Sequence, residues 1–125
     1  MKIGEISKLT GLNCSTLRYY EDINLIKNIK INETGQRDYT EEDLQWIKFV
    51  VSMKSACLPI EDIKKFGELY YSNNEDFNKR LSVALQCREK LIEERKKIDA
   101  GIKFLNKKVD LYKSILKTDM EEVKK

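Results

Sequence analysis

The feature that most constrains the fold is a long heptad pattern in the C-terminal part of the chain. Apolar side chains, interrupted by two arginines, recur there at alternating steps of four and three residues. The positions in this seam are Phe77, Leu81, Ala84, Arg88, Leu91, Arg95, Ile98, Ile102, Leu105, Val109, Tyr112 and Leu116. At about 1.5 Å per residue such a helix extends roughly 60 Å, too far to fold back on a small core. The pattern therefore predicts a coiled-coil helix over residues 75–117 that needs a partner.

The two halves of this seam differ in strength. Arg88 and Arg95 weaken the first half, whereas the half from Ile98 to Leu116 is continuously apolar. The residues expected at a dimer interface are Leu91, Ile98, Ile102, Leu105, Val109, Tyr112 and Leu116. The charged tail, residues 118–125, is expected to fray.

Composition predicts a mainly α-helical protein in a reducing compartment. The 125 residues include no His and one Pro, and they allow one small domain plus an extended element. The three cysteines are odd in number and far apart, which argues against a disulfide framework. No apolar run approaches the roughly 20 residues needed to span a bilayer, so a cytoplasmic location is expected. Cys87 stands alone with no Cys or His after it, and neither a metal site nor another cofactor is expected.

The first residues read as a helix-turn-helix. Ile3, Ile6 and Leu9 lie at helical spacing over residues 3–9, and Gly11 supplies the turn. Asn13 is a good N-cap for a second helix over residues 14–21, with Leu17 facing the core. In this arrangement the first helix braces the second against the major groove of DNA.

The second helix presents a polar face. Ser15, Thr16, Arg18 and Tyr19 face outward, and their hydroxyl and guanidinium groups suit phosphate oxygens and base edges. The alternative is an ordinary solvated helix face. Net charge does not decide between them, because residues 1–70 carry 10 Lys and Arg against 11 Asp and Glu.

A hairpin is predicted at about residues 29–39, directly after this helix. Apolar and polar residues alternate on both sides of a turn that contains Gly35. As a wing, the hairpin would direct Lys30 and Arg37 at a sugar-phosphate backbone. The alternative is a surface hairpin that merely covers the core.

Two further helices complete the predicted head, residues 1–71. Thr40 and Asp43 form a capping signal for a helix over residues 41–56. Pro59 then precedes an amphipathic helix over residues 60–70.

These pieces resemble the MerR family of bacterial transcription regulators over nearly the whole chain. The match rests on Leu-Arg-Tyr-Tyr-Glu at residues 17–21 and Gly-Gln-Arg-Asp-Tyr at residues 35–39. The resemblance implies a winged helix-turn-helix homodimer joined by an antiparallel coiled coil. It also implies binding to palindromic promoter DNA, which the dimer distorts, so that RNA polymerase is affected indirectly through the DNA. Thr16, Arg18 and Tyr19 would then contact the groove and phosphates, and Arg37 and Tyr39 would contact phosphate from the wing.

The chain is most similar to the short branch that lacks a ligand-binding domain and includes aldehyde-responsive, AdhR-like regulators. Members of that branch often carry a reactive cysteine in the third helix, where this chain has Ser52. Cys57 is a possible substitute sensor, and its alternative role is that of a small buried apolar residue.

The sequence allows one other functional class and argues against a second. A coiled-coil interaction module without specific DNA binding is the alternative to a regulator, since the head is slightly acidic. Enzymatic activity is not expected, because the chain has no His, no activated nucleophile pair and no phosphate-cradling Gly loop.

Overall fold

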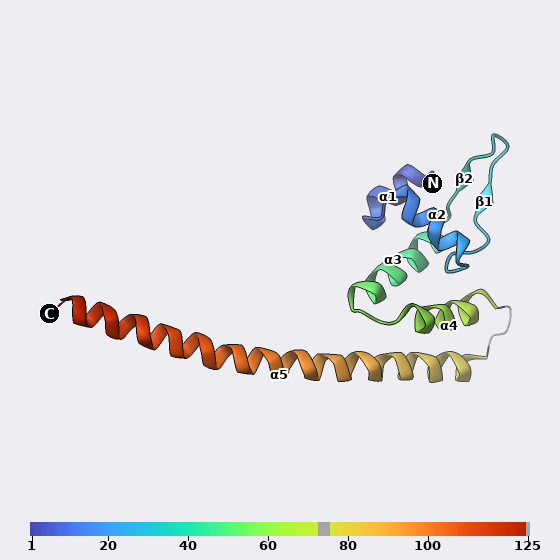
Figure 1. Ribbon diagram of the computed structural model, residues 1–125. Helices are drawn as coiled ribbons and strands as arrows, with labels where there is room; N and C mark the ends of the chain where they lie inside the picture. The colour runs from blue at the N-terminus through green and yellow to red at the C-terminus, as the bar shows by residue number, and fades with distance from the viewer. Residues whose placement is uncertain (73–75, 125) are drawn as a thin grey trace. The chain divides into compact units, whose positions relative to one another are not determined.

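The computed structural model describes residues 1–72 and 76–124, with side chains to Met120. It is mainly α-helical, with a helix-turn-helix, a two-stranded wing and one long C-terminal helix (Figure 1). This confirms the predicted fold class of the single chain. By its internal contacts the chain divides into two units, Met1–Arg88 and Glu89–Lys125. The candidate site and the core both belong to the first unit.

The helix-turn-helix consists of α1 (Ile3–Thr10) and α2 (Cys14–Asp22). Gly11 ends α1 in the left-handed region at φ 75°, and its N–H donates to the Ser7 carbonyl. The predicted N-cap is confirmed, because the Asn13 side chain accepts a 2.8 Å hydrogen bond from the Thr16 N–H. Leu17 is fully buried as predicted, whereas Leu9 is 49% exposed and lies outside the core.

The wing is shorter than the predicted hairpin. Strand β1 (Lys30–Ile31) pairs antiparallel with β2 (Arg37–Asp38), with Lys30 opposite Asp38. The reason is the turn, in which the Asn32 side chain accepts hydrogen bonds from the Thr34 and Gln36 N–H groups. Residues between the strands are therefore held by this side chain together with a 2.7 Å backbone hydrogen bond from the Asn32 N–H to the Gln36 carbonyl.

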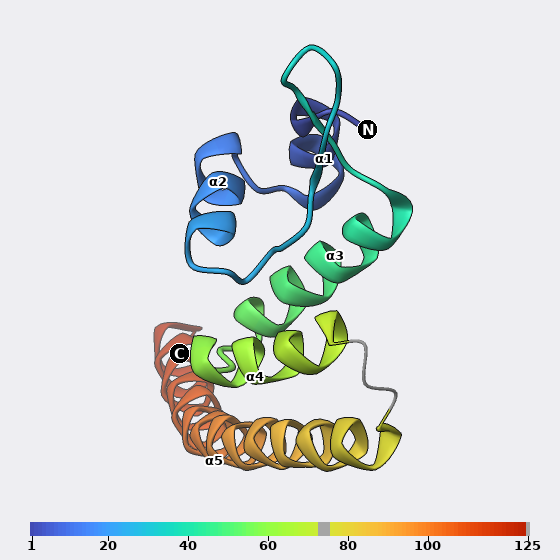
Figure 2. The ribbon, with the colours of Figure 1, turned by 90° about the vertical axis from the view of Figure 1, so that its right-hand side faces the viewer.

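Helix α3 (Glu41–Ser55) lies between the α1–α2 pair and α4 (Ile60–Tyr71), as Figures 1 and 2 show. The capping box at its start is confirmed, since Thr40 and Asp43 each accept from the other's backbone N–H, at 3.1 and 2.8 Å. The fully buried side chains of the head come from all these helices and from the turn after α2. They are Ile6, Leu17, Leu25, Ile26, Ile47, Val50 and Ile63.

Trp46 joins α3 to two other parts of the head. Its indole N–H donates a 2.9 Å hydrogen bond to the Leu25 carbonyl in the turn after α2. Its ring stacks on Tyr70 of α4, with centroids 4.7 Å apart and planes 10° apart. Gly67 lets α4 come this close, because a Cβ there would lie 3.0 Å from Cζ2 of the tryptophan. Only 3% of Trp46 remains exposed.

Helix α5 (Phe77–Lys124) spans the predicted coiled-coil segment as one continuous helix. The helix continues past Lys117 to Lys124, and the fraying expected of this tail stays a prediction. Residue 75, where the coil was predicted to begin, and Lys125 lie outside the described residues. Apolar side chains are uncovered along the second unit, with Ile98, Leu105 and Leu116 each more than 60% exposed. Among the described residues, no helix is both long and apolar enough to cross a membrane.

Substituting Gly67 tests the packing of Trp46. In Gly67→Ala the added methyl must displace a buried ring, which costs more than the gain in helix propensity. We expect a net loss of about 1–2 kcal/mol in the free energy of unfolding, measured by the fluorescence of the single tryptophan in urea. Gly4→Ala is the matched control, since a Cβ there meets nothing described within 4 Å, and it should gain about 0.5 kcal/mol. Equal stability of the two variants would contradict this account.

Candidate nucleic-acid interface

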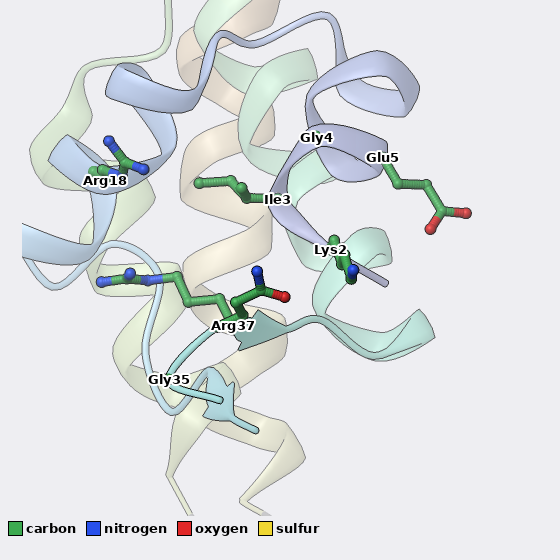
Figure 3. Close-up of a pocket in the computed structure, with 8 residues that line it drawn as sticks. Lys2, Ile3, Gly4, Glu5, Arg18, Gly35 and Arg37 are labelled. Atoms are coloured by element: carbon green, nitrogen blue, oxygen red, sulfur yellow. The ribbon is translucent and has the colours of Figure 1, made fainter. Parts of the chain in front are cut away.

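A hollow of about 610 Å³ lies between the start of α1, the helix α2 and the wing (Figure 3). Each element contributes side chains to it. Its lining consists of Lys2, Ile3, Gly4, Glu5, Arg18, Gly35, Gln36 and Arg37. The hollow is therefore built by three segments that are separate in the sequence.

The charges around this hollow are mostly positive. Lys2, Arg18 and Arg37 contribute three cations against the single carboxylate of Glu5. In Figure 3 the Glu5 side chain points away from the two arginines. A head with almost no net charge thus concentrates positive charge on one concave surface, which attracts anions locally.

Helix α2 exposes the predicted polar face beside this hollow. Arg18 and Tyr19 are exposed, Tyr19 to 54%, while Leu17 and Tyr20 on the opposite face are buried. Ser15 is exposed and its hydroxyl donates a 2.8 Å hydrogen bond to the Asn13 side chain, so its oxygen still has room to accept. Thr16 is partly exposed.

The predicted wing cations separate in the structure. Arg37 lies on the same hollow as Arg18. Lys30 is exposed but lines a different hollow of about 630 Å³, beside Tyr70 and Tyr71 of α4. The structure therefore brings Arg37, but not Lys30, to the surface that carries Arg18.

The expected phosphate contact of Tyr39 is wrong. The residue was expected to contact phosphate, but its side chain is only 2% exposed. The chain turns into the core after β2, and the Tyr39 N–H donates a 2.7 Å hydrogen bond to the Met1 carbonyl. Its hydroxyl lies 3.4 Å from Oε1 of Glu21. A ring held this way has almost no surface to offer DNA.

Glu21, near the end of α2, was missed as a site residue by sequence reasoning. Its Oε1 accepts a 2.7 Å hydrogen bond from Nε of Arg37, and both side chains are partly exposed. Only the acidic end of the 17–21 motif and the arginine of the 35–39 motif hinted at this pair. The hydrogen bond that Arg37 donates to Glu21 raises the pKa of Arg37, and the charge of Glu21 adds to that effect.

Burial controls the ionisation of Tyr39. It raises the pKa of the phenol to about 12 from an ordinary value of 10.0, and the negative charge of Glu21 adds to the shift. The folded protein therefore favours the neutral phenol.

The cysteines do not form a cluster. Cys57 is exposed, in the left-handed region at φ 63° just after α3, so its alternative role as a buried apolar residue is wrong. A sensor at Cys57 stays a prediction. Cys14 is partly buried and Cys87 is buried. Within the described part of the chain, no three Cys, Asp or Glu residues are grouped to hold a metal ion.

The family model for MerR helix-turn-helix regulatory proteins matches residues 1–68, which include α1, α2, the wing, α3 and most of α4. The chain belongs to the MerR family. It is 38% identical over 93 residues to the helix-turn-helix transcriptional regulator AdhR of Bacillus subtilis. That alignment covers 74% of this chain and 66% of AdhR, slightly less than two thirds of its length.

Solved structures match this MerR-family chain over most of its length. A crystal structure from Listeria monocytogenes, assigned to the MerR family of transcriptional regulators, has a TM-score of 0.90 at 32% identity. That comparison covers 99% of this chain and 94% of the other. HiNmlR, a MerR family regulator lacking the sensor domain and crystallised bound to promoter DNA, has a TM-score of 0.79 at 24% identity and covers 90% of each chain. At that identity HiNmlR supports the fold alone.

The raised pKa values of the buried tyrosines should be measurable in an alkaline titration. Because the pKa of Tyr39 is raised from 10.0 to about 12 on folding, its contribution to stability is complete below pH 10 and is lost as the pH rises towards 12. Tyr71 has a similarly raised pKa of about 12. The pKa of Tyr70 is raised as well, chiefly by burial. Of the six tyrosines, we expect three to ionise later than the others by ultraviolet absorbance, and two in Tyr39→Phe. Superimposable titrations of the wild type and this variant would contradict the assignment.

Proposed function

We propose that this MerR-family chain is a transcription regulator that binds promoter DNA, with α2 in the major groove and the wing on the sugar-phosphate backbone. The observation that carries the proposal is the meeting of Arg18 and Arg37 on one hollow beside the exposed face of α2. Arginine suits this role because its planar guanidinium binds phosphate or guanine through paired N–H groups. The proposed contacts of α2 are Ser15, Thr16, Arg18 and Tyr19.

The wing adds a second grip in this proposal. Arg37 contacts phosphate from the hollow, and Lys30 contacts the backbone further along the wing. Tyr39 supports this surface from the core rather than touching DNA, because it is buried. A protein that distorts DNA needs firm phosphate contacts on both sides of the distorted centre, which two copies of this head would supply.

A homodimer formed by α5 supplies those two heads. The apolar side chains of the seam are uncovered on the single chain, which favours a partner helix. The proposed interface comprises Leu91, Ile98, Ile102, Leu105, Val109, Tyr112 and Leu116, paired in an antiparallel coiled coil. Two heads related by symmetry read a palindromic site, and distortion of that site affects RNA polymerase indirectly.

The relatives support this reading by analogy. AdhR is a helix-turn-helix transcriptional regulator, and the Listeria monocytogenes structure is assigned to the MerR family of transcriptional regulators. The proposal places the protein in the bacterial cytoplasm and gives it no catalytic activity.

Arg18→Ala tests the DNA contact. We expect binding to the DNA upstream of the protein's own gene to weaken by about 1–3 kcal/mol if Arg18 reads a base. If it holds a phosphate instead, the dependence of binding on salt should flatten. Both are measured by gel shift and fluorescence anisotropy over a range of salt concentrations. Lys117→Ala removes the same charge from the end of α5 and should leave binding unchanged. A wild-type protein that binds upstream and random DNA equally well would refute the proposed function and favour a protein-interaction module.

Leu105→Glu tests the dimer. A charge in the middle of the seam should weaken dimerisation by about 10-fold or more, because a buried leucine contributes about 1.5–3 kcal/mol. Analytical ultracentrifugation over a concentration series measures this shift from dimer to monomer. Ala100→Glu introduces the same charge on α5 outside the seam and should remain dimeric. Dissociation of both variants to the same extent would argue against this seam as the interface.

A further inference from the structure

The carboxylate of Glu21 connects the recognition helix to the wing. One of its oxygens, Oε1, lies 2.7 Å from Nε of Arg37 and 3.4 Å from the hydroxyl of Tyr39. Arg37 lies on β2, and Tyr39 is the first residue after that strand. Glu21 lies in the last turn of α2. A single carboxylate oxygen therefore holds one side chain of β2 and the side chain of the residue just after that strand.

This contact determines which part of Arg37 is free. The guanidinium is a rigid plane with five N–H groups, and Glu21 occupies the one on Nε. The two terminal nitrogens can still donate a parallel pair of hydrogen bonds, the geometry that phosphate accepts. Figure 3 shows the guanidinium extending from the wing towards the side of the hollow that carries Arg18.

A carboxylate beside a DNA-binding arginine has two opposing effects. Its negative charge repels phosphate, which weakens binding to any DNA. Its hydrogen bond fixes the plane of the guanidinium and the distance between wing and α2, which favours DNA whose groove and backbone fit that distance. The charge of Glu21 alone would weaken DNA binding. By orienting the guanidinium of Arg37, however, Glu21 makes binding more selective.

We propose that Glu21 is a positioning residue that aims Arg37 at a backbone phosphate and thereby sets the preference for the specific site over other DNA. This rests on the proposed function, in which Arg37 contacts phosphate. Tyr39 contributes by fixing the same carboxylate from the core. Arg37 rather than Glu21 makes the proposed contact, since Glu21 is not among the residues that line the hollow.

The experiment compares binding to the upstream DNA with binding to a random duplex, by fluorescence anisotropy at several salt concentrations. Glu21→Ala should lower the preference for the upstream site by about 10-fold, and its binding to random DNA should be unchanged or slightly stronger. Glu21→Gln should fall in between, because a neutral amide still accepts from Arg37, though more weakly. Melting followed by Trp46 fluorescence shows whether each variant is folded.

Asp22→Asn is the matched control. Asp22 neighbours Glu21 and acts on Arg37 through its charge, without a described hydrogen bond to it. Its substitution should strengthen binding to both DNAs alike and leave the preference unchanged.

A double-mutant comparison tests whether Glu21 acts through Arg37. In an Arg37→Ala background, Glu21→Ala should cause no further loss of preference, because the residue that it positions is gone. An equal loss in both backgrounds, or a loss in Asp22→Asn as large as in Glu21→Ala, would overturn the positioning role and leave the proposed function intact. A wild-type protein without any preference would overturn both.

Discussion

The head depends on the packing of Trp46, since this one side chain fixes α3 against the elements on both sides of it. Its hydrogen bond to the Leu25 carbonyl satisfies a polar group in the turn that follows α2, and its ring covers α4 at Tyr70. A small core has few fully buried side chains, so each such contact is a large share of the stability. The position of α2, and of the chain entering the wing, follows from this contact.

The proposed DNA-binding surface forms where the ends of three elements meet. Helix α2 ends with Glu21 and Asp22, the hairpin returns with Arg37, and the start of α1 lies on the other side of the hollow. None of the three is strongly basic, and the head as a whole is not. Cations gather because three segments meet, and the one acidic side chain on the hollow points away from the arginines. In the proposed function, binding to an anionic polymer depends on the arrangement of charge rather than on its sum.

The features that sequence predicted well obey local rules. The N-cap of Asn13, the capping box of Thr40 and Asp43, and the left-handed Gly11 depend on residues within one turn of each other. Tyr39 and Cys57 depend on the path of the chain. Alternation placed Tyr39 on a wing, but the strand turns inward there and buries the ring. Cys57 adopts a left-handed conformation after α3 and is exposed there. Residue spacing does not predict this conformation.

The pairing of Glu21 with Arg37 also depends on the path of the chain rather than on a local rule. Both residues belong to motifs that are visible in the sequence, yet their contact spans 16 residues and depends on how closely the hairpin returns to α2. Periodicity assigns each residue to its element and says nothing about the distance between elements. The long helix shows the opposite case, because a heptad pattern is local and predicted α5 over most of its length.

Hydroxyl-radical footprinting on the DNA upstream of the protein's own gene tests the central claim most directly, namely that two copies of this head bind a symmetric site. The account predicts two protected half-sites related by a dyad on one face of the duplex, separated by a spacer between them. A single unpaired footprint, or protection that is uniform along the DNA, would contradict it.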